Sequence, residues 1–139
     1  MLGLIMEQQA VRRATVAGIP GFRIERAAIV LPAANDPAQL ARAADQSLVL
    51  ISRNVQDFLR LNESWTVLRE WSLAHRRHAG ILLPLGAVRD IDWADRVMDL
   101  LLHPRCPLLS DQLLLWRAAT GTWESDHPYS AQRRRAVQL

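Results

Sequence analysis

Residues 48–61 read LVLISRNVQDFLRL, an apolar run that passes through a short polar step into a helical pattern. The first five residues are continuous, short and rich in β-branched side chains, which is typical of a strand buried on both faces. The step at residues 52–54 ends this strand, and a helix is predicted from about Val55. The stretch therefore predicts one β-α unit of a parallel sheet.

The same alternation extends along the chain on both sides of this unit. Strands are predicted at residues 2–6, 22–26 and 79–83, and helices at residues 7–18, 36–46 and 93–102. The order β-α-β-α-β-α-β-α predicts an α/β fold with a mostly parallel sheet of four or five strands and helices on both faces. Residues 108–116 fit either a last helix or a fifth strand, and the pattern leaves both open.

Length and composition indicate one domain in a chain of 139 residues. We assign residues 1–120 to the domain and 121–139 to a polar, arginine-rich tail that is expected to fray. The single cysteine excludes an internal disulfide framework and a cysteine-based zinc cluster. No apolar run approaches the ~20 residues of a membrane span, and no secretory pattern opens the chain, so we expect a cytoplasmic protein.

The charge is formally +3, and all seventeen basic residues are arginine. Arginine suits bidentate contact with phosphate or carboxylate, although a GC-rich coding sequence explains the same bias. Three arginines in a row, residues 133–135, account for most of the net positive charge. The overall charge alone is therefore weak evidence for nucleic-acid binding.

Few polar residues lie where ligands bind in an open parallel sheet, at the carboxyl ends of the strands. The candidates follow the predicted first, second and third strands: Glu7, Asp36, Asn54 and Asp57. Oxygen ligands of this kind suit Mg²⁺ or Mn²⁺. A metal held there could activate water for phosphodiester hydrolysis.

Each candidate also has a purely structural explanation. Asp36 fits a helix cap next to Pro37, and Asp57 lies where a carboxylate favours the helix dipole. Asn54 is a common turn residue, and Glu7 can simply begin a helix. Among the histidines only the pair at residues 75 and 78 has close spacing, and a solvated loop explains it. No glycine-rich phosphate loop is present.

Three segments together resemble a bacterial family of PIN-like proteins of uncharacterised function. Residues 49–61 match its apolar strand followed by Asn-x-x-Asp-Phe, and residues 78–83 match its His-Ala-Gly leading into a strand. Residues 35–44 resemble the helix before this signature. The resemblance covers roughly residues 2–102. It implies a three-layer PIN-like fold, a metal-dependent ribonuclease activity and a relation to the toxins of toxin–antitoxin modules.

The resemblance also implies roles for particular residues. Asp36 and Asp57 would bind Mg²⁺ or Mn²⁺, with Glu7 as a third ligand and Asn54 as a neutral ligand or water positioner. The phosphates of an RNA substrate would contact Arg53 and Arg60. The family's first strand usually ends in Asp-Glu, where this chain has Met6-Glu7, and Asn54 stands at an acidic position. These departures indicate an eroded acidic cluster.

Two other functions fit the same residues. A catalytically inactive PIN-like module could bind RNA or protein, with an apolar surface on residues 55–73 meeting an antitoxin or a second copy in a homodimer. A small-molecule binder of the flavodoxin type is the third option, which no phosphate-loop glycine supports.

Overall fold

The computed structural model describes residues 35–71 and 76–139. The predicted strands at residues 2–6 and 22–26, and the predicted helix at 7–18, lie outside the described residues. Within them, three helices and five strands form a mixed α/β fold. The elements run α3 (Asp36–Asp45), β1 (Leu50–Ile51), α4 (Val55–Glu70), β2 (Ile81–Leu85), α5 (Asp90–Leu101), β3 (Leu113–Arg117), β4 (Thr122–Asp126) and β5 (Arg134–Ala136).

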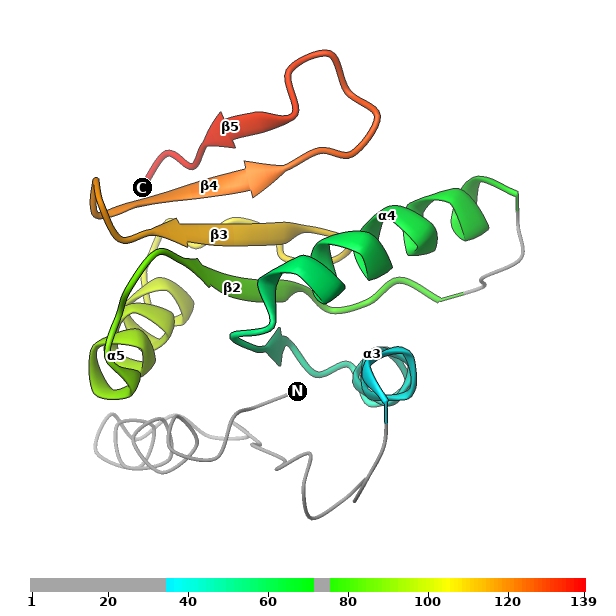
Figure 1. The fold of residues 1–139 in the computed structure, drawn as a ribbon, viewed down its shortest axis with the longest axis horizontal. Helices are drawn as coiled ribbons and strands as arrows, with labels where there is room; N and C mark the ends of the chain where they lie inside the picture. Colours follow the sequence, from blue (N-terminus) through cyan, green and yellow to red (C-terminus); the bar gives the residue numbers. More distant parts are fainter. Residues whose placement is uncertain (1–34, 72–75) are drawn as a thin grey trace.

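The five strands form one open sheet in the order β1-β2-β3-β4-β5 (Figure 1). β1, β2 and β3 are parallel, with Leu50 opposite Ile81 and Ile81 opposite Leu113. β4 and β5 are antiparallel to their neighbours. The sheet expected to be mostly parallel is therefore mixed: both pairings of β4 are antiparallel, because the short turn after β3 returns the chain in the opposite direction.

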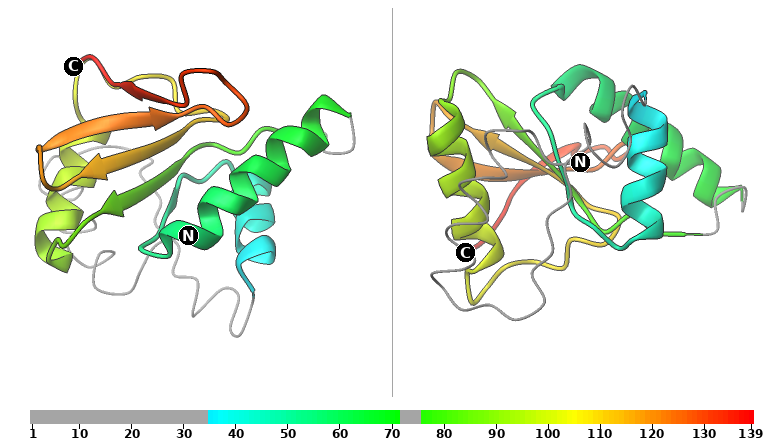
Figure 2. Two further views of the ribbon diagram at one scale, coloured as in Figure 1. Left: turned by 45° about the horizontal axis from the view of Figure 1, so that its top comes forward. Right: turned by 90° about the horizontal axis from the view of Figure 1, so that it is seen from below.

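Successive side chains of the parallel strands point to opposite faces of the sheet, so the sheet has a buried core on each face. On one face Leu50, Ile81 and Leu113 pack with residues of α3 and α4. On the other face Leu82 and Leu114 pack with residues of α5. Figure 2 shows the sheet between α5 on one side and α3 and α4 on the other. Among the described residues, helices therefore pack against both faces of the sheet.

Pro84 lies inside β2, where a strand end was expected. The carbonyls of Gly80 and Leu82 accept hydrogen bonds from the backbone N–H groups of Leu50 and Ser52. The backbone polar groups of residues 80, 82 and 84 therefore point toward β1. Pro84 thus lacks its N–H on the side toward β1, and β1 is too short to pair with the chain at that position. The β2–β3 ladder therefore loses no hydrogen bond, and the strand continues through the proline.

Helices α3 and α4 begin where the sequence predicts, with one difference in the capping residue of α3. Asn35, not Asp36, is the N-cap of α3, and its side chain accepts a hydrogen bond from the backbone N–H of Ala38 at 3.1 Å. Asp36 is consequently the first helical residue, where its charge favours the helix dipole and its carboxylate remains available for other contacts. α4 begins at Val55 as expected and runs to Glu70.

The ambiguous segment at residues 108–116 leads into strand β3, and the residues after Gly121 do not fray. They form β4 and β5, which extend the sheet. Asp126 has a fully buried side chain, and it accepts hydrogen bonds from Arg133 at 2.8 Å and from Arg134 at 2.6 Å. Arg133 also pairs with Glu63 of α4. The tail is ordered because its arginines neutralise buried and half-buried carboxylates.

Candidate functional site

Asp36, Asn54 and Asp57 converge beside the carboxyl end of β1. The side-chain amide of Asn54 donates one hydrogen bond to Oδ2 of Asp36 at 2.7 Å and another to Oδ2 of Asp57 at 2.8 Å. The two carboxylates come from the first turns of different helices, α3 and α4. One amide nitrogen therefore bridges two acidic side chains that belong to separate segments of the chain.

Local backbone geometry aims Asn54 at this pair. Asn54 is the N-cap of α4, but its side chain makes no capping hydrogen bond to the helix. Its backbone N–H donates to the hydroxyl of Ser52 at 3.0 Å, which turns the chain between β1 and α4. The amide is therefore free to satisfy the carboxylates instead of the helix end.

The electrostatics of the site reflect the closeness of the two acids. Partial burial raises the pKa of Asp36 above its ordinary value, and the negative charge of Asp57 raises it further. The hydrogen bond from Asn54 acts on the pKa in the opposite direction. A cation between the two carboxylates would remove the same repulsion that now favours protonation of Asp36.

The two arginines expected at the site lie differently. Arg53 forms an ion pair with Asp90 at the start of α5 and donates to the carbonyl of Val88, so it joins two loops at the carboxyl edge of the sheet. Arg60 is exposed on α4, one turn after Asp57, and it makes no hydrogen bond or ion pair with the described residues. Arg60 is thus the arginine near Asp57 whose guanidinium is open to a phosphate.

Glu7, the third expected ligand, lies outside the described residues. Within residues 35–71 and 76–139, no three His, Cys, Asp or Glu side chains are arranged to hold a metal ion. Asp36 and Asp57 form a pair of acids, and Asn54 presents its amide nitrogen to both of them. Oxygen ligands of this type match the preference of Mg²⁺ and Mn²⁺.

A second polar cluster contradicts the prediction that His78 lies in a solvated loop. His78 is buried, and its Nδ1 accepts a hydrogen bond from the backbone N–H of Gly80 at 3.2 Å. Its Nε2 therefore carries the proton and donates to Oδ1 of Asn62 at 3.0 Å. Burial lowers the pKa of His78 to about 4, and the charge of Arg69 acts in the same direction.

The sequence holds one signal for this cluster. Asn62 lies on the same helical face as Phe58 and Trp65, at the spacing of residues that pack against the sheet. A polar residue in that stripe requires a buried partner, because an unpaired amide in a core is costly. His78, which precedes the buried strand β2, is the partner that the fold supplies.

Comparisons with family models, curated proteins and solved structures give no match for this chain. Among the described residues, no helix has the length and apolar character needed to cross a membrane.

Proposed function

We propose that this chain is a cytoplasmic PIN-like protein of the toxin–antitoxin type, a metal-dependent ribonuclease with an eroded acidic site. The observation that supports the proposal is the meeting of Asp36, Asn54 and Asp57 beside the end of a parallel strand. The edge at the carboxyl ends of such strands is where ligands of open α/β sheets bind. The motif Asn-x-x-Asp-Phe, which resembles the PIN-like signature, supplies two of these three side chains.

In this proposal Asp36 and Asp57 hold Mg²⁺ or Mn²⁺, with Glu7 as a further ligand. The bound metal activates water and stabilises the charge that develops on a phosphodiester during hydrolysis. Asn54 keeps the two carboxylates within reach of one cation, and Arg60 contacts a phosphate of the RNA. A phosphate can reach Arg53 only by displacing Asp90.

The replacement of an acid by Asn54 has a definite physical effect. Each carboxylate contributes a formal charge that offsets the free energy of dehydrating the cation, and an amide contributes only a dipole. The amide hydrogens also occupy the oxygen atoms of both acids when no cation is bound. We therefore expect weak metal affinity and slow hydrolysis compared with a site of three carboxylates.

A manganese titration by calorimetry tests this function. Wild-type protein should bind Mn²⁺ with saturation, and Asp57→Asn should abolish the binding. Asp92→Asn is the matched control, because Asp92 is also an acid in the first turn of a helix, α5, and its side chain is partly exposed. Absence of Mn²⁺ binding in the wild type, or equal loss in both variants, would overturn the proposal. Cleavage of single-stranded RNA should follow the same order.

A non-catalytic interaction module is the second candidate, and the outer face of α4 favours it. Val67, Leu68 and Trp71 are exposed there, and Trp71 is exposed by 73%. An apolar stripe of this kind suits an antitoxin chain or a second copy of the protein. Light scattering of the purified protein, with and without Trp71→Ser, separates a homodimer from a monomer that awaits another partner.

A further inference from the structure

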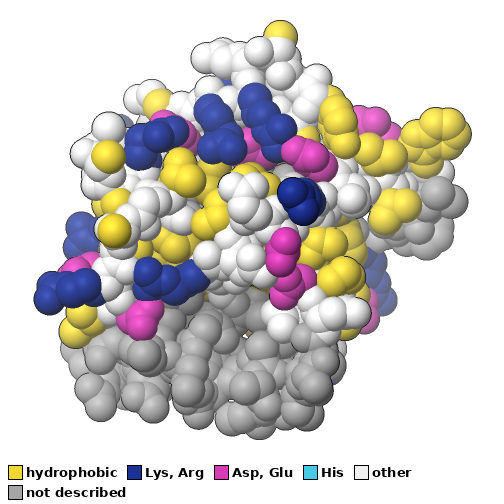
Figure 3. Space-filling model, viewed as in Figure 1, with side chains coloured by type: hydrophobic (Ala, Val, Ile, Leu, Met, Phe, Trp, Pro, Cys, Tyr) yellow, Lys and Arg dark blue, Asp and Glu magenta, His cyan; other side chains and the backbone are white. Residues whose placement is uncertain are grey.

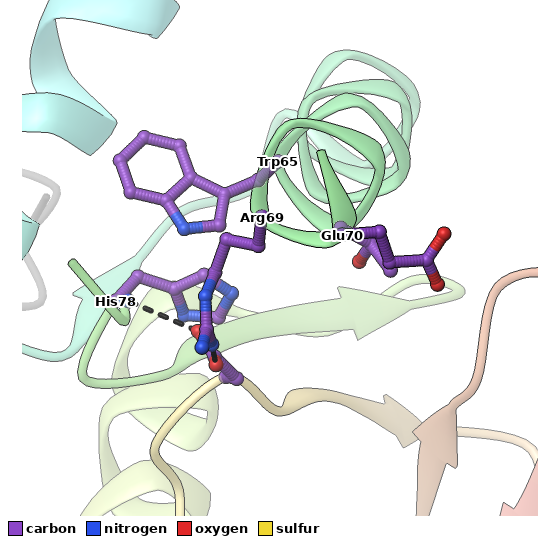
Figure 4. Close-up of a pocket in the computed structure, with 6 residues that line it drawn as sticks. Trp65, Arg69, Glu70 and His78 are labelled. Carbon is purple, nitrogen blue, oxygen red and sulfur yellow. Dashed lines mark hydrogen bonds and ion pairs between the residues drawn. The ribbon is translucent and has the colours of Figure 1, made fainter. Parts of the chain in front are cut away.

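A pocket of about 300 Å³ opens beneath the last turns of α4, and it is lined by Trp65, Thr66, Arg69, Glu70, His78 and Asp111 (Figure 4). His78 precedes β2 and Asp111 precedes β3, so the pocket lies at the amino ends of these strands. It is separated from Asn54 by about 20 Å, the length of helix between residues 54 and 69. The volume is at the lower end of the range for ligand pockets and fits one small molecule.

Two arginines, Arg69 in the pocket wall and Arg77 beside the pocket, contact the carboxylate of Asp111. Arg69 forms an ion pair with Oδ2 of Asp111, and Nε of Arg77 lies 3.7 Å from the same oxygen atom. The other oxygen of Asp111 accepts from the backbone N–H of His78 at 3.2 Å. One carboxylate therefore faces two guanidinium groups, each with further N–H donors available to a second anion.

Glu70, the other acidic residue that lines the pocket, does not supply that anion. In Figure 4 the side chain of Glu70 points away from Trp65, Arg69 and His78, on the opposite side of Arg69. Arg69 and Arg77 are both partly open to solvent, with 28% and 64% of their side chains exposed. A ligand can therefore reach their free donors without disrupting the ion pair.

The wall of the pocket on the side of Arg69 away from Glu70 is aromatic. Trp65 lines the pocket with its indole ring, and its Nε1–H already donates to the carbonyl of Arg76 at 3.2 Å. The ring of His78 lies edge-on to it, with 6.2 Å between the ring centroids. The donor atom of the indole is thus occupied, and the part of the ring that lines the pocket can pack with a planar group.

We propose that this pocket binds a small planar aromatic anion, with its acidic group between Arg69 and Arg77 and its ring against Trp65. Both an aromatic carboxylate and a nucleoside monophosphate have this chemistry. The site does not depend on the acidic cluster at the opposite end of α4. Failure of metal binding or of ribonuclease activity leaves it untouched, and its own failure leaves the proposed ribonuclease untouched.

Calorimetric titrations of the intact protein with four probes test the proposal. The probes are benzoate, adenosine monophosphate, benzylamine and inorganic phosphate. Benzoate or adenosine monophosphate should saturate the site, and the tighter of the two identifies the acidic group that it prefers. Benzylamine has the ring with the opposite charge and should not bind. Phosphate has the charge without a ring and should bind at least about tenfold more weakly.

Arg77→Met is the decisive variant, because Arg77 is largely exposed and its removal leaves the Arg69–Asp111 pair intact. It should weaken the binding of the aromatic anion about tenfold. Arg105→Met, which removes an exposed arginine from the segment between α5 and β3, is the control and should change nothing. The proposal is overturned if neither aromatic anion binds with a Kd below ~10 mM. It is also overturned if benzylamine binds as tightly as benzoate, or if phosphate binds as tightly as the aromatic anions. Equal effects of the two variants on affinity would overturn it as well.

Discussion

The side-chain amide nitrogen of Asn54 lies 2.7 Å from Oδ2 of Asp36, although 18 positions separate the two residues in the chain. The same nitrogen also donates to Asp57, so Asn54 joins the starts of α3 and α4. An aspartate at position 54 could not donate these hydrogen bonds. The identity of this one residue therefore decides whether the two carboxylates receive hydrogen bonds from position 54.

The substitution Asn54→Asp should make the stability of the protein depend on a bound cation. Without metal, three carboxylates repel one another and two hydrogen bonds are lost, so we expect a loss of about 1–3 kcal/mol in the free energy of unfolding. Addition of Mn²⁺ should restore that stability, and the variant should bind Mn²⁺ more tightly than the wild type does. Chemical denaturation with and without Mn²⁺ measures both effects.

Asn54→Ala provides the comparison, because it removes the hydrogen bonds without adding a charge. Its stability should respond to Mn²⁺ much less than that of Asn54→Asp. An equal response in the two variants would mean that residue 54 does not face the cation.

Protonation of His78 should destabilise the protein in mild acid. Its pKa is about 4 in the folded protein against the ordinary 6.5, so the unfolded chain binds more protons between these values. Stability is therefore complete above about pH 6.5 and falls as the pH approaches 4, by about 3 kcal/mol in total. Urea denaturation at several pH values measures this slope.

Other groups also titrate in that range, so the slope needs a reference. His78→Gln keeps a hydrogen-bonding side chain but removes the titration, and its stability should fall less steeply between pH 6.5 and 4. If the two slopes coincide, the acid sensitivity has another origin.

Removal of the charge on Asp126 should strongly destabilise the β4–β5 hairpin. The side chain of Asp126 is buried between Arg133 and Arg134, and Asp126→Asn leaves both guanidinium groups facing a neutral amide. We expect a loss of about 3 kcal/mol in the free energy of unfolding. Thermal or chemical denaturation of the variant measures it.

Glu124→Gln is the matched control for this variant. Glu124 also pairs with an arginine, Arg117, but both side chains are partly exposed to water. Its loss should be about 0–1 kcal/mol. Equal losses at positions 124 and 126 would show that burial does not govern the hairpin.

A methyl group at Gly80 should disturb the start of β2. Gly80 has φ of +128°, and an added Cβ would lie 2.9 Å from Cβ of Leu109. Gly80→Ala should therefore destabilise the protein by about 2–3 kcal/mol, through both backbone strain and the close contact. Chemical denaturation of the variant measures the loss.

Gly121→Ala separates backbone strain from the close contact. Gly121 has φ of +66°, and a Cβ added there would meet no atom within 4 Å. The variant should therefore lose only about 1 kcal/mol, from backbone strain alone. A loss as large as that of Gly80→Ala would mean that the contact with Leu109 contributes nothing.

On the face drawn in Figure 3, the arginines do not form an uninterrupted basic surface, because acidic side chains lie among them over β4 and β5. Arg117 and Arg133 pair with Glu124 and Asp126 respectively. The arginine-rich tail, which the sequence presents as a positive extension, is largely neutralised within the fold. A basic run in the sequence therefore overstates the charge available to RNA.

The sequence by itself determined the elements whose signals are local. The buried strand at β1, the capped start of α3 and the amphipathic pattern of α4 depend on neighbouring residues, and each was predicted close to its place. The pairing of Asp36 with Asp57 was expected only through the rule for parallel sheets and the PIN-like resemblance. The described structure brings the two acids together through Asn54.

Only the tertiary structure decided the features that depend on distant partners. The tail became β4 and β5 because Asp126 could be neutralised by Arg133 and Arg134 and because β3 offered an open edge. His78 became a core residue because Asn62, sixteen positions earlier, satisfies its ring. Local patterns carry no information about such partners, since the free energy of a buried polar group depends on what the fold places opposite it.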